Sequence, residues 1–228
     1  MRNSVSMTGG VFFILLLILG YYFLPPLVTG ATRFTQLRQW LTDPAAHPEL
    51  AIAAGNRCGD APFVLPTDGY LGFGWGDSFR PGHQHQGLDI FGGADLNQTP
   101  VVAAHDGYLT RESDWVSSII IRHPSDPLNP SRQIWTYYTH LADQYGTSFI
   151  LPDFPRGTRE LFVTAGTLLG YQGNYSADPA NPVGIHLHFS VVQSKPDGGY
   201  KNELDINNTY DPIPYLGLAL KDGVWKCP

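Results

Sequence analysis

The chain has 228 residues, enough for one domain with a hydrophobic core and additional segments. Hydrophobic residues make up 43% of the sequence and charged residues only 15%, which excludes a disordered chain and a polyelectrolyte. The net charge is -6 and no run is rich in lysine or arginine, so we expect no nucleic-acid partner. The 25 glycines and 19 prolines favour short strands joined by turns over long helices.

The first segment of the sequence is strongly apolar. No Asp, Glu, Lys or Arg lies between residues 2 and 33, and the stretch Gly9–Val28 spans twenty residues. As a helix it is about 30 Å long, which matches the hydrocarbon core of a bilayer. The proline pair at 25–26 shortens the helix, so a cleaved signal peptide is the alternative to a membrane anchor. We expect residues 1–30 to be a signal anchor or signal peptide, with the rest extracytoplasmic, either anchored or secreted.

Two short helical segments are predicted after the apolar stretch. The pattern over residues 32–41 places three apolar residues on one helical face, namely Phe34, Leu37 and Leu41. A second helical stretch is predicted at residues 48–54, before a glycine. We expect residues 31–58 to form a helical stalk or a brace against the domain that follows.

The texture changes at about residue 59 to short apolar runs broken by Gly, Pro and Asp. Several runs are rich in β-branched and aromatic residues, as strands are. They occupy residues 101–104, 118–122, 134–138, 160–163 and 185–192. No helix-length periodic segment separates them, so residues 59–228 are expected to form one mainly β, antiparallel domain. Residues 124–132 and 174–182 are predicted to be loops, and such loops beside a rigid site shape a substrate groove.

The two cysteines, Cys58 and Cys227, lie far apart in the sequence. Neither belongs to a C-x-x-C pair, which argues against a thiolate metal site or a redox motif. Two interpretations stay open. Export favours a disulfide between them, and the alternative is two unrelated free thiols.

The chemistry-bearing residues gather in three islands: His85-Gln-Gly-Leu-Asp89, Tyr138-Thr-His140-Leu141 and His186-Leu-His188. Histidine and carboxylate together are typical zinc ligands, and a hydrolytic zinc site keeps three protein ligands with one position open for water. The four histidines and one aspartate therefore supply one such triad and two further imidazoles for proton transfer. No H-E-x-x-H occurs, so the glutamate base of that peptidase class is absent.

The local setting of these residues gives each a physical argument and an alternative. His186 and His188 share one face of a predicted strand, so one binds a metal while its neighbour reaches the water or the substrate. An isolated H-x-H is also typical of satisfied or surface histidines. Asp89 lies between Leu88 and Ile90, where a buried carboxylate is costly unless it is paired or bound to a metal. Its alternative is a solvated aspartate at a strand end.

Three other histidines, at positions 83, 105 and 123, are interpreted as structural or incidental. Of these, His83 is close enough in sequence to His85 to compete with it as a ligand.

The three islands, in this order, resemble the lysostaphin-type zinc endopeptidases, peptidoglycan hydrolases with H-x-G-x-D, Y-x-H-L and H-L-H-F islands. The resemblance covers about residues 66–216. It implies Zn2+ held by His85, Asp89 and His188, with catalytic roles for His140 and His186. It also implies an antiparallel β-sheet metallopeptidase domain with an open groove, and peptidoglycan peptides as the substrate. Atypical loops leave the scissile bond open.

The predicted function is therefore a zinc-dependent endopeptidase that hydrolyses peptidoglycan peptide bonds with a metal-activated water. One alternative is a catalytically silent relative that binds wall peptides or regulates another hydrolase. Another is an Fe(II) oxygenase, because two histidines and one carboxylate also hold iron.

Overall fold

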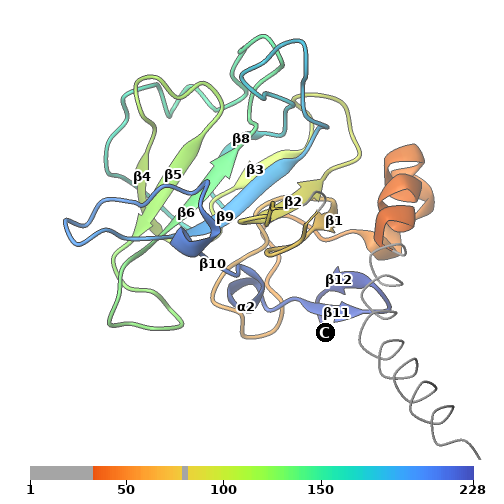
Figure 1. The fold of residues 1–228 in the computed structure, drawn as a ribbon, viewed down its shortest axis with the longest axis horizontal. Coiled ribbons are helices and arrows are strands. Elements are labelled where there is room, and N and C mark those ends of the chain that lie inside the picture. The colour runs from red at the N-terminus through yellow and green to blue at the C-terminus, as the bar shows by residue number, and fades with distance from the viewer. Residues whose placement is uncertain (1–32, 79–81) are drawn as a thin grey trace, which may run out of the picture.

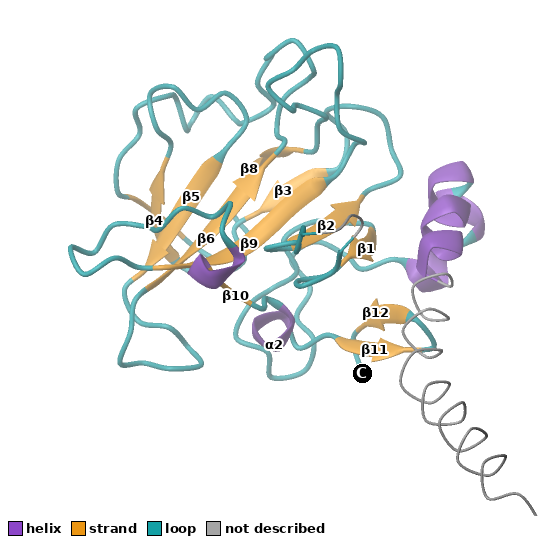
Figure 2. Ribbon diagram, viewed as in Figure 1, coloured by secondary structure: helices purple, strands orange, loops and turns teal. Residues whose placement is uncertain are grey.

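The computed structural model describes residues 33–78 and 82–228. The predicted signal anchor or signal peptide at residues 1–30 lies outside the described residues. No helix in the described part of the chain combines the length and the apolarity that a membrane span requires. The regular secondary structure of this part is mainly antiparallel β-sheet with a few short helices, so the predicted mainly β fold is confirmed (Figure 1, Figure 2).

The main sheet contains eight of the strands in the described residues, and the strand β10 joins it by pairing with β9. The other seven follow one another across the sheet. In spatial order they are β1 (Tyr70–Phe73), β2 (Leu88–Phe91), β9 (Leu187–Gln193), β6 (Ile134–Thr139), β5 (Ile119–His123), β4 (Gly107–Thr110) and β7 (Leu161–Val163), with β10 at Thr209–Tyr210. Every pairing between neighbours is antiparallel.

Two small antiparallel pairs and several short helices complete the described chain. The pairs are β3 (Pro100–Val102) with β8 (Leu168–Tyr171), and β11 (Ala219–Lys221) with β12 (Val224–Lys226). The helices are residues 33–42, the 3-10 turns η1 (Pro44–Ala46), η2 (Pro48–Leu50) and η3 (Ile206–Asn208), and α2 (Ile213–Leu216). The five predicted strands are present as β3, β5, β6, β7 and β9, with ends shifted by at most two residues.

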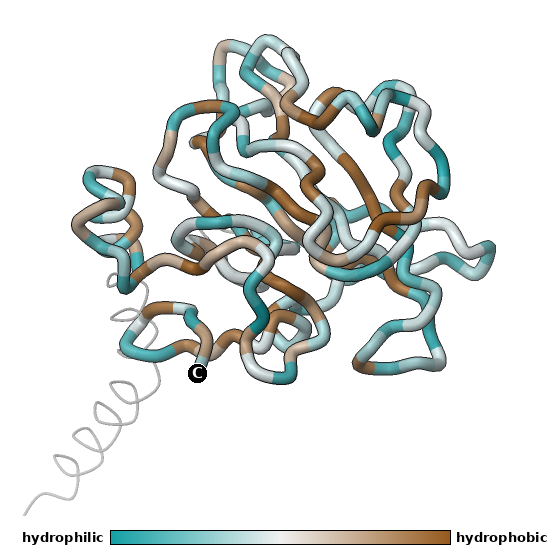
Figure 3. Tube along the Cα trace, turned by 180° about the vertical axis from the view of Figure 1, so that it is seen from behind, coloured by the Kyte–Doolittle hydropathy of each residue, from teal (hydrophilic) through white to brown (hydrophobic). Residues whose placement is uncertain are grey.

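The two faces of the main sheet differ in character. In β9, Leu187, Phe189 and Val191 are fully buried in the main hydrophobic core. His188 and Ser190 alternate with them and therefore point to the opposite face. Figure 3 shows hydrophobic stretches of the described trace running through the middle of the molecule, and many hydrophilic stretches in its outer turns. One face of the sheet thus holds the fold together, and the other is available for chemistry.

Residues 33–42 are helical, but the prediction of their apolar face is wrong, because two of its three residues are exposed. Phe34 is 66% exposed and Leu41 is 52% exposed, while Leu37 and Trp40 are buried. The indole N–H of Trp40 donates a hydrogen bond of 2.6 Å to the carbonyl oxygen of Phe91 in β2. This anchor turns the Trp40 side of the helix toward the sheet. The helix therefore packs against the sheet through Leu37 and Trp40.

The predicted second helix at residues 48–54 is also wrong in length. The 3-10 turn η2 ends at Leu50, and Ile52 then pairs with Gly69 in an isolated antiparallel bridge. The two backbone hydrogen bonds of this bridge measure 2.8 and 3.0 Å. Because an extended residue completes the bridge, the chain leaves the helical conformation before the glycine that marks the predicted end.

Cys58 and Cys227 form a disulfide, which decides between the two interpretations left open by the sequence. The bridge closes a loop between residues 169 positions apart in the sequence. Loop-closure entropy for such a span amounts to about 5 kcal/mol in the chain-entropy picture, an upper figure because native strain reduces it. The segment that precedes β1 is thereby fixed to the segment that follows β12.

Candidate metal centre

Three adjacent strands at the middle of the main sheet position the site. Asp89 in β2 is the register partner of His188 in β9, so the two side chains emerge side by side on the same face. Thr139, the last residue of β6, pairs with His188 from the other side. His140 follows immediately after β6, and His186 lies just before β9. All three sequence islands therefore meet where β2, β9 and β6 run next to one another.

Three of the predicted residues converge on a common point. Nε2 of His85 lies 3.1 Å from Oδ1 of Asp89 and 3.1 Å from Nδ1 of His188. Nδ1 of His188 lies 2.8 Å from the same carboxylate oxygen. A tetrahedral zinc site with bonds of 2.0 to 2.1 Å has edges of about 3.3 Å. The three atoms are buried and spaced as one face of such a tetrahedron.

The other nitrogen of each ligand imidazole is already committed. Nδ1 of His85 lies 3.0 Å from the carbonyl oxygen of Gly74, which only accepts, so Nδ1 carries the proton and Nε2 presents its lone pair. Nε2 of His188 lies 2.7 Å from Oε1 of Glu203 and donates to it. Two ring nitrogens and a carboxylate oxygen therefore face one another at close range. A cation between these three atoms would bind all of them at once, so the arrangement fits a metal site.

The electrostatics of the site agree with that demand for positive charge. Burial raises the pKa of the Asp89 carboxyl, but the histidines around it outweigh burial and hold that pKa well below its ordinary value. Burial lowers the pKa of His188, yet the charges of Glu203 and Asp89 outweigh it and raise that pKa to about 10. A proton and a metal ion thus compete for Nδ1 of His188, and binding of the metal releases the proton.

The glycine inside the first island has a steric reason. A Cβ on Gly87 lies 2.5 Å from the carbonyl oxygen of Phe189 and 2.9 Å from Nε2 of His188. Any larger residue at this position therefore collides with the backbone of β9 and displaces a ligand ring. The third position of the H-x-G-x-D island admits only glycine because β2 and β9 approach so closely at the site.

His140 and His186 stand beside the three converging atoms. Nδ1 of His140 donates to the carbonyl oxygen of Tyr175 at 2.6 Å, and Nδ1 of His186 donates to that of Gly184 at 2.7 Å. In His140 the proton is thus held at Nδ1, and Nε2 is left as a base. The ring centroids are 4.6 Å apart. Nε2 of His186 lies 3.4 Å from Oδ1 of Asp89.

Two features mark His140 as an unusual residue. Its φ of 71° places the backbone in the left-handed region, which a non-glycine residue adopts at a cost of about 1 to 3 kcal/mol. Burial, followed by the electrostatic influence of His186 and His188, lowers the pKa of His140 to about 3. The ring is therefore neutral at ordinary pH and accepts a proton only against a strong tendency to release it.

A cavity of about 520 Å³ opens over the site. Its walls include all five predicted site residues, and Tyr175, Ser176 and Ala177 come from the predicted loop 174–182. The loop therefore borders the groove, as expected. Ser118, just before β5, and Tyr137 of β6 also line the cavity, and the Tyr137 hydroxyl donates a hydrogen bond of 2.9 Å to that of Ser118.

The remaining histidines lie apart from the group of converging ligands. His83 lines the cavity, but the three-residue group that fits a metal contains His85 instead. His123 is buried, with Nδ1 at 2.8 Å from the carbonyl oxygen of Asp106 and Nε2 at 2.9 Å from Oγ1 of Thr136. The His105 ring packs against Phe63 at 5.3 Å between centroids.

Glu203 was not predicted from the sequence, although its carboxylate is hydrogen bonded to the predicted ligand His188. It follows β9 by ten residues in a polar stretch with no distinguishing pattern. Only the folded chain brings its carboxylate to Nε2 of His188.

No family model matches the chain, and none of the curated proteins matches it. Among solved structures, one similar domain is a point mutant of the catalytic domain of the prophage-encoded M23 protein EnpA from Enterococcus faecalis. It is 20% identical over 64% of this chain and 93% of that chain, with a TM-score of 0.39. Another is a candidate glycyl-glycine endopeptidase, lytM, from Ruminococcus gnavus, 24% identical over 58% of this chain and 45% of that chain, with a TM-score of 0.36. With TM-scores below 0.5, neither similarity supports a function for this chain, and any function must be argued from its own residues. In its three islands the chain resembles the lysostaphin-type family.

Proposed function

We propose that the chain is a zinc-dependent endopeptidase of the lysostaphin type that hydrolyses peptide bonds in peptidoglycan. The observation that carries the proposal is the convergence of His85 Nε2, Asp89 Oδ1 and His188 Nδ1 within 3.1 Å of one another. Two histidines and one carboxylate, with a cavity on the remaining side, form the ligand set of a hydrolytic zinc centre.

A zinc ion held there supplies a nucleophilic water at neutral pH and polarises the carbonyl group of the substrate. The further steps belong to residues of the chain. His140, whose Nδ1 proton is held by the carbonyl oxygen of Tyr175, accepts the proton of the attacking water at Nε2 and passes it to the leaving amine. His186 is oriented by the hydrogen bond of its Nδ1 to the carbonyl oxygen of Gly184, and its Nε2 points to the Asp89 carboxylate beside the metal position.

The position of His186 is supported by a stacked aromatic ring. The Phe91 ring lies 5.0 Å from the His186 ring between centroids, at an interplanar angle of 24°. Phe91 is in turn held by the hydrogen bond from Trp40 to its carbonyl oxygen. A ring that is stacked on one face and hydrogen bonded at Nδ1 is oriented before substrate arrives, which is what proton transfer requires.

The proposed place of action is outside the cytoplasm. The Cys58–Cys227 disulfide supports this proposal, because disulfides persist in oxidising compartments and are rare in the cytosol. Residues 1–30 then serve as a membrane anchor, or as a signal peptide if they are cleaved. Peptidoglycan peptides and the membrane are accordingly the proposed partners.

The test is digestion of purified peptidoglycan by the purified chain, followed by mass spectrometry of the released peptides. We expect one defined peptide bond to be cut, no release in the presence of a chelator, and recovery when zinc is restored. Release that is insensitive to the chelator contradicts the proposal. A zinc-loaded protein that cuts nothing points instead to the silent relative, and turnover that needs iron and oxygen points to the oxygenase.

A further inference from the structure

We infer that Glu203 is a positioning residue of the metal centre: its carboxylate fixes the orientation of His188 and thereby sets the affinity for the metal. The inference rests on the proposed metal centre, and adds to it a residue outside the three islands. Glu203 lies in the segment 194–208 between β9 and β10.

The contacts of the Glu203 carboxylate place it behind the ligand. Oε1 accepts a hydrogen bond of 2.7 Å from Nε2 of His188, and the ring presents its opposite nitrogen, Nδ1, to Asp89. The same oxygen also accepts a hydrogen bond of 3.2 Å from the hydroxyl of Ser190. Two donors from one strand therefore fix this oxygen, and through it the rotation of the His188 ring.

The alternation of β9 explains why these two donors point to the same acceptor. His188 and Ser190 are two residues apart, so their side chains lie on the same face of the strand. Ser190 is fully buried, and the Glu203 side chain is only 13% exposed. A buried carboxylate is costly unless it is paired, so its location beside an imidazole N–H and a hydroxyl is a built arrangement.

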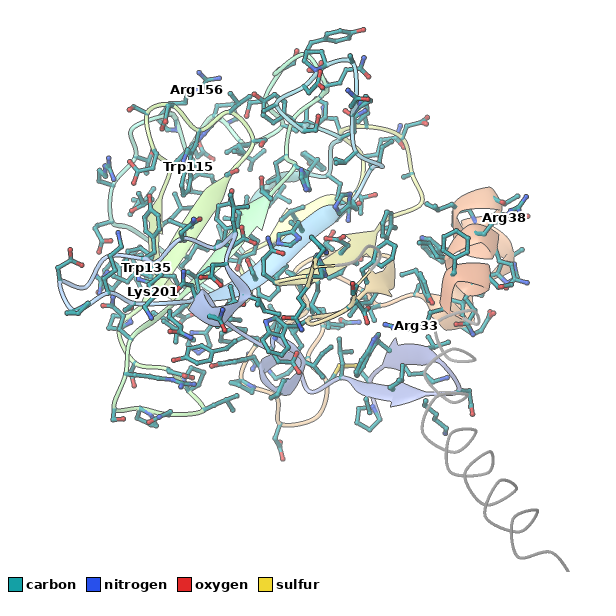
Figure 4. The ribbon with its side chains drawn as sticks, viewed as in Figure 1. Arg33, Arg38, Trp115, Trp135, Arg156 and Lys201 are labelled. Carbon is teal, nitrogen blue, oxygen red and sulfur yellow. A yellow bond between two sulfur atoms is a disulfide. The ribbon has the colours of Figure 1, made fainter. Side chains whose placement is uncertain are left out.

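The segment that carries Glu203 is anchored on both sides of that residue. The Tyr200 ring packs on Trp135 of β6 and on Trp115, at 5.4 and 5.8 Å between centroids; Figure 4 labels both tryptophans and Lys201. The backbone N–H of Lys201 donates 2.9 Å to the carbonyl oxygen of Gln193.

On the far side, the side chain of Asn208 donates 2.9 Å to the carbonyl oxygen of Asn202. With the segment tied down before and after it, Glu203 has little freedom to leave His188. The carboxylate is thus presented to the ring by the fold and does not depend on a chance rotamer of a free loop.

An anionic acceptor on the far nitrogen of a ligand histidine does two things. It fixes the tautomer that leaves Nδ1 free to ligate, and it raises the basicity of the ring as a ligand. The loss of such partners typically weakens metal affinity by roughly 10- to 100-fold. Glu203 therefore contributes to catalysis through His188 and does not contact the substrate's reacting atoms.

The experiment measures the dissociation constant for zinc by competition with a chelating dye, for the full chain and its variants. Glu203→Ala is expected to weaken zinc binding by roughly 10- to 100-fold. Glu203→Gln keeps the shape and an acceptor oxygen but loses the charge, so a smaller loss is expected. Ser190→Ala removes only the second donor and should have the smallest effect. Glu49→Gln, the same change on the exposed turn η2, is the matched control and should leave the constant unchanged.

The outcomes separate this inference from the proposed function. If the unaltered chain binds no zinc, the metal centre and this inference both fall. If the unaltered chain binds zinc and both Glu203 variants bind it equally well, only the role of Glu203 falls. Thermal unfolding of each metal-free variant identifies a folding defect. A merely structural role of Glu203 lowers the melting temperature. It does not produce zinc affinities that are weakest for Glu203→Ala, intermediate for Glu203→Gln and least affected for Ser190→Ala.

Discussion

At the scale of single residues, the site divides into side chains that hold the metal and side chains that move protons. His188 belongs to the first kind, since its Nδ1 faces Asp89 and His85. His140 belongs to the second, since its proton is held at Nδ1 by the carbonyl oxygen of Tyr175 and its Nε2 is free of that bond. The left-handed backbone of His140 is strain of the kind that structures retain where a side chain must be aimed.

This division predicts different results for two alanine variants. His188→Ala removes one of three ligands and should lose both bound zinc and peptidoglycan cleavage. His140→Ala leaves the three ligand atoms in place and should keep zinc, while the rate falls by roughly 10²- to 10⁴-fold, the usual contribution of general acid–base catalysis. Metal analysis of the purified variants and rates of peptide release measure the two effects. Full activity in a zinc-loaded His140→Ala protein contradicts its catalytic role.

At the scale of elements, the helix at residues 33–42 is connected to the site through Trp40 and Phe91. Trp40 is buried with Leu37 and Tyr70 in a cluster separate from the main core. Trp40→Ala should lower the free energy of unfolding by about 3 to 5 kcal/mol, the usual cost of removing a buried aromatic residue. Because Phe91 supports His186, the variant should also turn over more slowly with its zinc content unchanged.

Phe34→Ala is the matched control for this prediction. Phe34 lies on the same helix but is 66% exposed, so its removal should change stability by less than about 0.5 kcal/mol. Chemical denaturation of the two variants measures the difference. Equal effects from both substitutions mean that the helix does not brace the sheet through Trp40.

The same helix shows where sequence reasoning fails. Leu37 belongs to the apolar stripe expected from the sequence and also to the stripe that is buried, so periodicity alone does not distinguish Phe34 from Trp40. The choice depends on the carbonyl oxygen of Phe91, a partner 51 positions away. The strands β1, β4 and β8 were not predicted, because each is four residues long with a glycine and presents no continuous apolar run.

The candidate site was more predictable than the strand boundaries. Each island is local in sequence, and an H-x-H on a strand places two imidazoles on one face whatever the rest of the fold does. The five predicted residues are accordingly brought to one cavity. Glu203 was missed because its only signal is its contact with His188, which depends on how the segment 194–208 packs on Trp135 and Trp115.

At the scale of the whole molecule, the sheet has a core face and a site face, and one titratable side chain, that of His123, is buried on the core face. His123, at the end of β5, is 1% exposed and packs near Phe63. Burial lowers the pKa of His123 from 6.5 to about 4, with a smaller contribution from His105 that is opposed by the carbonyl oxygen of Asp106. The native state thus holds this ring neutral under conditions in which the unfolded chain protonates it.

The sign of the pH dependence follows from this depressed pKa. Above pH 6.5 the ring is neutral in both states and nothing is lost. As the pH falls from 6.5 to 4 the unfolded chain binds a proton that the native protein does not, so stability decreases by about 3 kcal/mol. His123→Phe should remove this part of the slope, although it removes the hydrogen bonds of the ring to the carbonyl oxygen of Asp106 and to Thr136 and lowers stability at neutral pH. Urea unfolding of both metal-free proteins at several pH values tests this, and parallel curves between pH 6.5 and 4 exclude His123 as the source.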